Sequence, residues 1–400
     1  MISSAPETLP STVEKQDWKK LSQVKVVHMT SVHTAVDIRI FQKECRSLAR
    51  AGFQVTSIGS HSIDTVIDHV SIKSVKRDQA RLTRMTRTVW RVYREAMKQS
   101  GDVYHFHDPE LIPIGLLLRA NGKHVIYDLH EDYPKDILSK SYLPLWTRIP
   151  IAWMMKQLEN VSCRHFSAVV TVTPSIADRF RSVNKRTVVV HNFPSTKDLV
   201  TSRSVQSWDS RRQSVAYVGG IMGVRSIYEM VEAMSLIPSS FRATLELAGP
   251  HPDGEPTVAE LSRKPGWERV YHHGFINQLS TFDILHNVRA GLVLFHPIPN
   301  HMEAMPQKIF EYMGAGLPVI ASDFPLWRRI IGDSGSGIFV DPKDPRAIAQ
   351  AIEYILSHPT EAEEMGRRGR EAVLKHYNWD VQAERLVKLY SEIVNPLCVA

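Results

Sequence analysis

The chain has 400 residues, of which 43% are hydrophobic and 23% charged, an ordinary composition for a globular protein of two or three domains. Its cysteines, Cys45, Cys163 and Cys398, lie far apart and form no C-x-x-C pair, which argues against a disulfide framework or a zinc site. We find no apolar run of about eighteen residues and no apolar leader, so we expect a cytoplasmic protein without a membrane span. The formal net charge of +7 leaves nucleic acid, anionic lipid and anionic substrates as partner classes.

Strands and helices alternate through the first half of the chain, after residues 1–21, which we expect to be disordered. The predicted strands are residues 24–29, 54–58, 103–107, 124–129, 168–172 and 187–191, with an amphipathic helix at 38–51. This alternation predicts a parallel sheet with helices on both faces.

Two of these strands end in polar side chains. His130 follows the strand at 124–129, within the sequence Asp-Leu-His-Glu-Asp-Tyr-Pro. His105, His107 and Asp108 crowd another strand end and are residue types that bind metals, but an H-x-H-D pattern without further ligands is a weak signal. A single histidine is also commonly structural. We therefore predict no metal site and keep His130 as a candidate for the functional site.

The alternation of strands and helices starts again in the second half, after a polar stretch rich in Ser, Thr and Arg. The predicted strands are residues 215–218, 244–248, 269–272, 292–295, 319–321 and 338–340, and the tail at 346–393 is helical. The predicted fold class is therefore α/β, with two doubly wound Rossmann-like domains facing a cleft and helices near the C-terminus. We place the domains at 22–195 and 214–375, with a linker at 196–213 and a C-terminal helix, 376–400, crossing back to the first domain. Ligands of such sheets bind at the carboxyl ends of the strands.

The most informative segment begins at Glu303 and enters a helix. Pro306 suits the first helical position, and residues 307–313 are good helix formers. The N–H groups at the start of this helix favour an anion, and Lys308 adds a positive charge. Glu303 before the helix and Glu311 on its second turn can then hold sugar and ribose hydroxyls, although glutamates at this spacing are commonly only solvated.

A glycine pair, Gly219 and Gly220, follows the first strand of the second half. Glycines there let the backbone approach a ligand closely, and Arg225 can hold a diphosphate through its guanidinium group. The alternative is a plain strand-to-helix turn.

Two segments of the first half, 81–94 and 143–156, read as amphipathic helices. The first interleaves arginines with apolar side chains, and the second is rich in tryptophan and methionine. Each can lie on an anionic membrane surface, or pack its apolar side on the sheet with its charges in water.

These motifs together resemble glycosyltransferase family four, whose members are retaining enzymes of the GT-B fold. The resemblance is carried by residues 37–44, 48–55, 127–134, 217–220, 247–249, 273–275 and 306–322. It implies a donor bound mainly by the second domain and an acceptor bound mainly by the first. This sequence has Gly220 where the family often has a second basic residue, and residues 31–36 lack the glycines usual in that loop.

The resemblance also implies roles for single residues. Glu303 matches the glutamate that contacts the donor sugar, Glu311 the one that holds the ribose, and Arg225 a phosphate ligand that Lys308 assists. His130 matches a histidine near the sugar, and we expect it to be catalytic together with Glu303 and Asp37. The remaining donor-binding residues are expected to be Gly219, Gly220, Gly274, Phe275, Met305, Pro306 and Gln307.

The predicted function is that of a retaining glycosyltransferase without a metal cofactor. The donor is expected to be a nucleotide sugar, with UDP as its nucleotide, and the acceptor a glycan or lipid-linked glycan of surface polysaccharide or glycolipid synthesis. The enzyme would be cytoplasmic and peripheral on the inner face of the membrane. The alternatives are a nucleotide-sugar epimerase of the same fold and a non-catalytic basic protein that binds lipid or nucleic acid. Carboxylates beside the phosphate site argue against nucleic acid.

Overall fold

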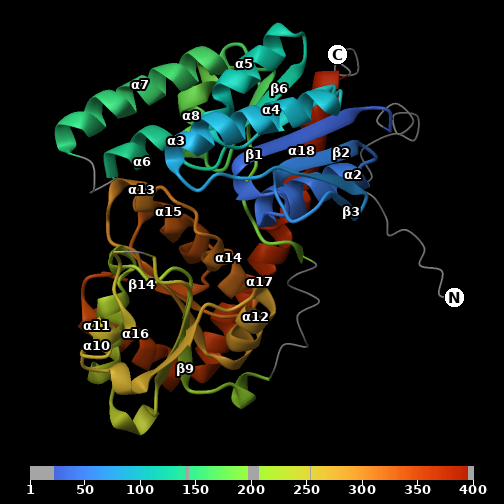
Figure 1. Ribbon diagram of the computed structural model, residues 1–400. Coiled ribbons are helices and arrows are strands. Elements are labelled where there is room, and N and C mark those ends of the chain that lie inside the picture. Colours follow the sequence, from blue (N-terminus) through green and yellow to red (C-terminus); the bar gives the residue numbers. More distant parts are fainter. Residues whose placement is uncertain (1–21, 140–143, 197–206, 253, 395–400) are drawn as a thin grey trace, which may run out of the picture. The chain divides into compact units, whose positions relative to one another are not determined.

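The computed structural model describes residues 22–139, 144–196, 207–252 and 254–394. The predicted disordered leader, 1–21, and residues 197–206 of the predicted linker lie outside the described residues. The described residues form two compact units, one comprising the chain up to Asn192 together with the segment from Trp379 onward, and the other Phe193–Asn378. Each unit is a sheet of mainly parallel strands covered by helices (Figure 1), as the alternation of strands and helices predicts.

The first unit is built on an eight-stranded sheet with the order β3-β4-β2-β1-β5-β6-β7-β8. Its strands are β1 (Lys25–Thr34), β2 (Gln54–Ser60), β3 (Thr65–Ile67), β4 (Val70–Ser74), β5 (Val103–Phe106), β6 (His124–Leu129), β7 (Ala168–Thr171) and β8 (Thr187–Val189). The sequence analysis missed β3 and β4, which form the antiparallel pair of this sheet. Their turn consists of Asp68 and His69, both with positive φ (48° and 63°), in place of the usual Asn-Gly or Asp-Gly signal.

The helices of the first unit include a π-helix close to its N-terminal strand. The helical elements are η1 (Ile38–Cys45), α2 (Arg46–Arg50), α3 (Arg81–Thr83), η2 (Arg84–Thr88), α4 (Val89–Lys98), η3 (Pro109–Leu111), α5 (Ile112–Ala120), α6 (Tyr133–Ser139), α7 (Leu145–Cys163), α8 (Pro174–Arg181) and α18 (Trp379–Val394). The π-helix η1 begins after Asp37, whose carboxylate accepts hydrogen bonds from the backbone N–H groups of Arg39 and Ile40 at 2.8 and 3.1 Å. π-helical turns are rare and are frequent at functional sites. This one buries Arg39 and Glu44.

The last helix, α18, completes the core of the first unit. Trp379, Leu386 and Tyr390 are buried on one face of α18, in the same apolar cluster as Ile40 and Leu48. The Trp379 indole also donates a hydrogen bond of 2.9 Å to the hydroxyl of Ser47. A segment distant in sequence therefore belongs to the packing of the N-terminal sheet.

The second unit has a six-stranded parallel sheet with the order β11-β10-β9-β12-β13-β14. Its strands are β9 (Ser214–Val218), β10 (Thr244–Ala248), β11 (Val270–Gly274), β12 (Ala290–Val293), β13 (Val319–Ser322) and β14 (Gly337–Val340). Each lies where a strand is predicted, because buried parallel strands read as short apolar runs.

Helices cover both faces of this sheet. They are η4 (Trp208–Ser210), η5 (Gly223–Arg225), α10 (Ile227–Leu236), η6 (Ser239–Phe241), α11 (Val258–Leu261), η7 (Trp267–Arg269), α12 (Gln278–Asn287), α13 (Pro299–Met302), α14 (Gln307–Gly314), α15 (Pro325–Trp327), η8 (Arg328–Gly332), α16 (Pro345–Ser357) and α17 (Pro359–His376). Within the segment predicted as a linker, Trp208 and Arg211 are buried in this unit, with the guanidinium group 5.1 Å from the centre of the indole ring.

Candidate active site

Three glycines lie at the carboxyl ends of neighbouring strands in the second unit. Gly219 follows β9, Gly249 follows β10 and Gly274 ends β11, and all three have positive φ. A Cβ atom on Gly249 would lie only 1.9 Å from the carbonyl oxygen of Gly219, so no side chain fits between these two turns. The N–H of Gly249 donates to the carbonyl of Gly274 at 2.8 Å. The result is a stretch of bare backbone at the edge where open α/β sheets bind their ligands.

Lys308 lies beside this backbone, on the first turn of α14. Its ammonium nitrogen would be 2.6 Å from a Cβ atom on Gly219, and it lies 4.0 Å from the centre of the Tyr217 ring. The side chain is buried, and its nitrogen has no hydrogen-bond partner among the described residues. Burial and the nearby charge of Arg225 hold the pKa of Lys308 well below its usual range, while Glu311 opposes them. A buried ammonium group without a partner is a strong attractor for an anion.

Arg225 supplies the second positive charge of this site. Its guanidinium group lies 5.3 Å from the centre of the Phe295 ring, which is also 5.5 Å from the ammonium nitrogen of Lys308. A Cβ atom on Gly220 would be 3.2 Å from a guanidinium nitrogen of Arg225, so this glycine leaves room for the arginine. The two cations thus gather around one aromatic ring and the glycine pair.

The sequence analysis missed Tyr217 and Phe295, whose rings flank the two cations. The Tyr217 hydroxyl donates a hydrogen bond of 2.7 Å to the carbonyl of Gly220, and burial raises the pKa of Tyr217 to about 12 although Arg225 acts in the opposite direction. Tyr217 belongs to the Tyr-Val-Gly-Gly motif and Phe295 ends a predicted strand, so the sequence could have indicated both as site residues.

The loop before α14 contains the other predicted donor-binding residues. Glu303 is exposed and caps the C-terminal end of α13, while Met305 and Pro306 are half-buried. The indole of Trp327 donates a hydrogen bond of 2.8 Å to the carbonyl of Ala304 and fixes the loop. The predicted position of Pro306 is wrong by one residue, because its ψ of 130° is extended and makes it the N-cap, so that the helix begins at Gln307.

Glu311 and Phe275 lie at two further places in this unit. Glu311 is on the second turn of α14, close enough to Lys308 to affect its pKa. Phe275 follows Gly274 and is 80% exposed, so its ring is free to stack on a planar group. The structure thus gathers Gly219, Gly220, Arg225 and Lys308 closely, with Glu311 on the same helix as Lys308.

His130, one of the two residues predicted for the site in the first unit, is held by a buried carboxylate. Its Nε2 atom lies 3.1 Å from Oδ2 of Asp128 and 3.3 Å from Nδ1 of His107. Two nitrogens of Arg39 contact the Asp128 carboxylate at 3.1–3.3 Å. Burial would raise the pKa of Asp128, but the Arg39 guanidinium and His130 hold it well below its usual value. Asp128 is therefore a fixed negative charge behind His130.

Asp37 lies near this group, together with a histidine that the sequence analysis did not select. Nδ1 of His33 is 3.5 Å from Asp37, and this contact is the main reason that the pKa of His33 is raised. The other ring nitrogen of His33 is 3.6 Å from Asp108, and its ring centre is 5.8 Å from that of His130. Because the Asp37 carboxylate also caps η1, it has a structural role as well.

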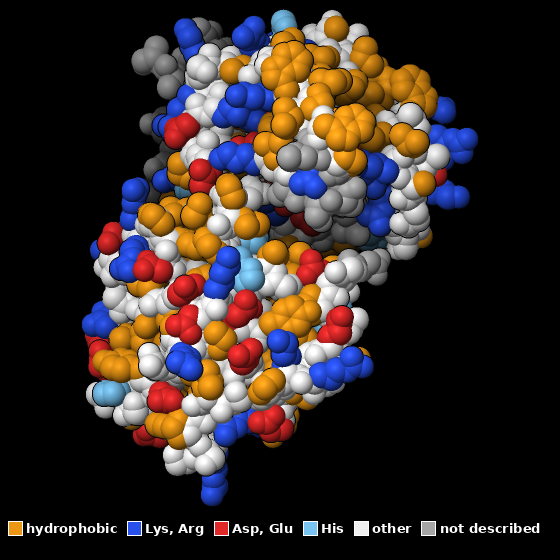
Figure 2. Space-filling view, turned by 90° about the vertical axis from the view of Figure 1, so that its left-hand side faces the viewer, with side chains coloured by type: hydrophobic (Ala, Val, Ile, Leu, Met, Phe, Trp, Pro, Cys, Tyr) orange, Lys and Arg blue, Asp and Glu red, His pale blue; other side chains and the backbone are white. Residues whose placement is uncertain are grey.

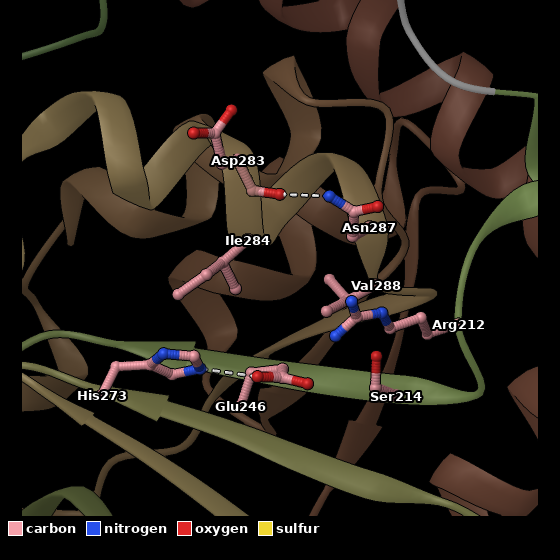
Figure 3. A pocket seen from close by; sticks show the side chains of 8 residues that line it. All are labelled: Arg212, Ser214, Glu246, His273, Asp283, Ile284, Asn287 and Val288. Carbon is pink, nitrogen blue, oxygen red and sulfur yellow. Dashed lines mark hydrogen bonds and ion pairs between the residues drawn. The ribbon is translucent and has the colours of Figure 1, made fainter.

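A pocket elsewhere in the second unit is distinct from this strand-end site (Figure 3). It is lined by Arg212, Ser214, Glu246, His273, Asp283, Ile284, Asn287 and Val288. Ser214 begins β9, so the pocket lies toward the amino end of that strand, under α12, whereas Gly219 follows its carboxyl end. An ion pair of 2.6 Å between His273 and Glu246 occupies part of its wall.

Comparison with known proteins assigns both halves of the chain. Residues 39–197 match the family described as Glycosyltransferase Family 4, and residues 201–372 match Glycosyl transferases group 1. The chain belongs to glycosyltransferase family 4. This membership makes the protein a glycosyltransferase, an enzyme that uses a nucleotide-sugar donor.

Curated relatives of this glycosyltransferase are distant. An uncharacterized glycosyltransferase from Methanocaldococcus jannaschii is 26% identical over 306 residues, covering 72% of this chain and 75% of the relative. The D-rhamnosyltransferase WbpZ from Pseudomonas aeruginosa is 23% identical over 291 residues, covering 70% of each chain.

Solved structures share the fold of this glycosyltransferase over nearly its whole length. Sucrose-phosphate synthase from Thermosynechococcus elongatus has a TM-score of 0.70 at 19% identity, covering 93% of this chain and 100% of the other. Anabaena HepE in complex with UDP-glucose has a TM-score of 0.65 at 15% identity, covering 92% and 99%. These similarities confirm the predicted GT-B fold.

The two amphipathic segments of the glycosyltransferase differ in how their side chains are used. In the segment 81–94, Arg84 pairs with Glu110 at 2.7 Å and Arg91 pairs with Asp78 at 2.6 Å, so that part of its charge is neutralised within the protein. Helix α7 instead exposes a row of large apolar side chains, namely Trp146, Ile149, Trp153 and Met154, which are 59–78% exposed. Figure 2 shows hydrophobic side chains gathered in its upper part, where α7 runs in Figure 1. Within the described part of the chain, no helix is both long enough and apolar enough to cross a bilayer.

Proposed function

We propose that this glycosyltransferase transfers a sugar from a UDP-sugar with retention of anomeric configuration. The observation that carries the proposal is the buried ammonium group of Lys308, which has no hydrogen-bond partner in the described structure and lies beside Arg225 and the bare backbone at Gly219. This arrangement is incomplete without an anion, and a nucleoside diphosphate supplies one. The solved structures of HepE in complex with UDP and with UDP-glucose support the choice of UDP.

The diphosphate is proposed to bind without a divalent metal. Two cations and the N-terminus of α14 can stabilise the charge that develops on the leaving phosphate, and preorganised charges in a buried site are effective at this. Arg225 and Lys308 are proposed to compensate the negative charge of the diphosphate, so that the protein itself supplies the positive charge.

The other donor-binding residues are proposed to contact the sugar, the ribose and the base of the nucleotide. Glu303 is proposed to position the donor sugar, Glu311 to accept hydrogen bonds from the ribose, and Gly274 and Phe275 to contact the base. Met305, Pro306 and Gln307 form the loop and helix start between the two glutamates. No enzyme nucleophile is assigned, so we propose front-face attack, in which the leaving phosphate helps to deprotonate the acceptor.

The first unit is proposed to bind the acceptor. His130, backed by Asp128, and Asp37 are its proposed catalytic residues. The hydrogen bond from Nε2–H of His130 to Asp128 would leave Nδ1 available for a substrate hydroxyl.

A lipid-linked acceptor is supported by the exposed face of α7. A helix with Trp, Ile and Met on one face, and with Arg148 and Lys156 among its polar residues, suits the interface of an anionic membrane. We therefore propose that the enzyme acts peripherally on the inner face of a membrane, in the synthesis of a surface polysaccharide or glycolipid.

The donor proposal is tested by calorimetric titration of UDP and GDP into the enzyme, with and without Mg²⁺. We expect UDP to bind with the same affinity in both buffers and more tightly than GDP. Binding that appears only with Mg²⁺ would refute the metal-free phosphate site. Conversion of a UDP-sugar into its epimer without any acceptor would refute transfer as the reaction.

A further inference from the structure

A cluster of three histidines and one glutamate lies inside the first unit, behind His130. His28 on β1 is paired in register with His105 on β5, and His107 directly follows the end of β5, with its ring centre 4.6 Å from that of His105. The π-helix η1 contributes Glu44 to the cluster. The H-x-H-D pattern, which lacked further ligands in the sequence, thus gains two potential ligands from distant segments.

The distances within the cluster are those of a small coordination sphere. Oε2 of Glu44 lies 3.9 Å from Nδ1 of His28, 4.0 Å from Nδ1 of His105 and 3.9 Å from Nε2 of His107. Nδ1 of His28 and Nε2 of His107 are 3.0 Å apart. In a tetrahedral zinc site with bonds of about 2.0–2.1 Å, neighbouring ligand atoms lie about 3.3 Å apart. The observed separations bracket that value.

Glu44 is poorly satisfied by the protein alone. All four side chains of the cluster are fully buried. Oε1 of Glu44 lies 3.0 Å from Nε of Arg39, and Oε2 faces the three imidazole rings at 3.9–4.0 Å without a hydrogen bond from any of them. A buried carboxylate oxygen without a donor costs free energy, and a protonated carboxyl group would be too far from each imidazole nitrogen to donate to it.

Two buried carboxylates share one arginine side chain in this interior. Glu44 and Asp128 carry two carboxylates in this interior, and both contact the single guanidinium group of Arg39. Burial and the neighbouring carboxylate of Asp128 raise the pKa of Glu44 well above its usual value, so Glu44 becomes a metal ligand by releasing its proton.

We propose that His28, Glu44, His105 and His107 bind one divalent transition-metal ion, with Zn²⁺ as the ion that suits this donor set best. Three imidazole nitrogens and one carboxylate oxygen are borderline ligands, and four protein ligands without an open position are typical of a structural site. This ion is separate from the donor phosphates, so the titrations with Mg²⁺ do not test it.

The side chains around the cluster lie where they could hydrogen-bond to the second nitrogen of each metal-binding histidine. Metal-binding histidines commonly donate their other N–H to a carboxylate or hydroxyl group. Nδ1 of His107 is 3.3 Å from Asp128, and Nε2 of His28 is 3.3 Å from the hydroxyl of Tyr390. A metal on Nε2 of His107 would fix its proton on Nδ1, toward the carboxylate that also holds His130. The same hydroxyl of Tyr390 is 2.8 Å from Nδ1 of His105 and would lose that contact on metal binding.

The proposal is tested on the full-length protein from zinc-supplemented culture, purified without chelator. Mass spectrometry of the metal content is expected to give one zinc ion per chain, and Glu44→Gln and His105→Gln to lower the occupancy about tenfold or more. The matched control is His272→Gln, because His272 and His251 form a histidine pair of 3.0 Å in the second unit outside the cluster. It should leave the metal content unchanged.

A second measurement avoids the risk that the variants fail to fold. The unmodified enzyme is stripped with dipicolinate and reloaded with Co²⁺, which should give the visible absorption of tetrahedral cobalt, while Zn²⁺ should restore the Tm lowered by stripping. A wild-type enzyme that contains no zinc and binds neither Zn²⁺ nor Co²⁺ would overturn the proposal and leave a hydrogen-bonded histidine network. Equal loss of metal in His272→Gln would overturn it as well.

Discussion

Replacing Lys308 with methionine should weaken donor binding and stabilise the unliganded enzyme at the same time. Its ammonium group is buried, has no hydrogen-bond partner among the described residues, and is repelled by Arg225. Loss of a charge-assisted contact to a phosphate should cost about 1.5–3 kcal/mol, and each 1.4 kcal/mol is a tenfold change in Kd. Removal of a buried polar group without a partner should raise the free energy of unfolding by about 1–3 kcal/mol.

The two effects are measured separately, by calorimetry with UDP and by urea unfolding without ligand. The pKa of Lys308 is lowered in the folded state, so the wild type should gain stability as the pH rises from that lowered value toward the ordinary lysine value. The variant should lack this gain. Lys343→Met, at an exposed position of the same unit, is the control and should change neither quantity. A Lys308→Met enzyme that binds UDP normally, or that is less stable than wild type, would refute the reasoning.

Further predictions concern the other proposed roles. Glu311→Ala should weaken UDP binding by about 1.5–3 kcal/mol, because a ribose would lose a charged acceptor, whereas Glu303→Ala should mainly lower kcat; equal losses of UDP affinity in both variants would contradict the assignment. Changing Trp146 and Trp153 on α7 to serine should abolish sedimentation with anionic vesicles and leave UDP binding intact, and unchanged sedimentation would exclude α7 as the membrane contact. Burial lowers the pKa of His191 to about 4, so the unfolded state binds more protons between that value and the ordinary value. The free energy of unfolding should therefore fall by up to about 1.4 kcal/mol per pH unit as the pH drops through this window, and His191→Gln should fall less steeply in urea titrations.

The strands of both sheets could be predicted because buried parallel strands are short apolar runs separated by turns and helices. The hairpin of β3 and β4 could not, since its turn uses Asp68 and His69 at positive φ instead of a glycine. The π-helical geometry of η1 could not be predicted from the sequence either, because its apolar pattern resembles that of an ordinary α-helix.

The candidate site was only partly predictable. Lys308, Arg225 and the glycine pair were selected from motifs and from the family resemblance, and the structure places them together. The cluster around Glu44 was not, because it depends on the register that pairs His28 with His105 across two strands far apart in the chain. Pattern and spacing identify residues near a turn or helix end, whereas such long-range register follows only from the folded sheet.

The packing of α18 sets an order for folding during synthesis. Domains generally fold as units while the chain emerges from the ribosome, N-terminal part first. Here the core around β1 and η1 lacks Trp379, Leu386 and Tyr390 until the last helix has emerged. The core of the N-terminal unit therefore stays incomplete until Phe193–Asn378 and then α18 have been synthesised. Truncation just before Trp379 should consequently destabilise the N-terminal sheet, and a fragment that ends at Asn192 should aggregate.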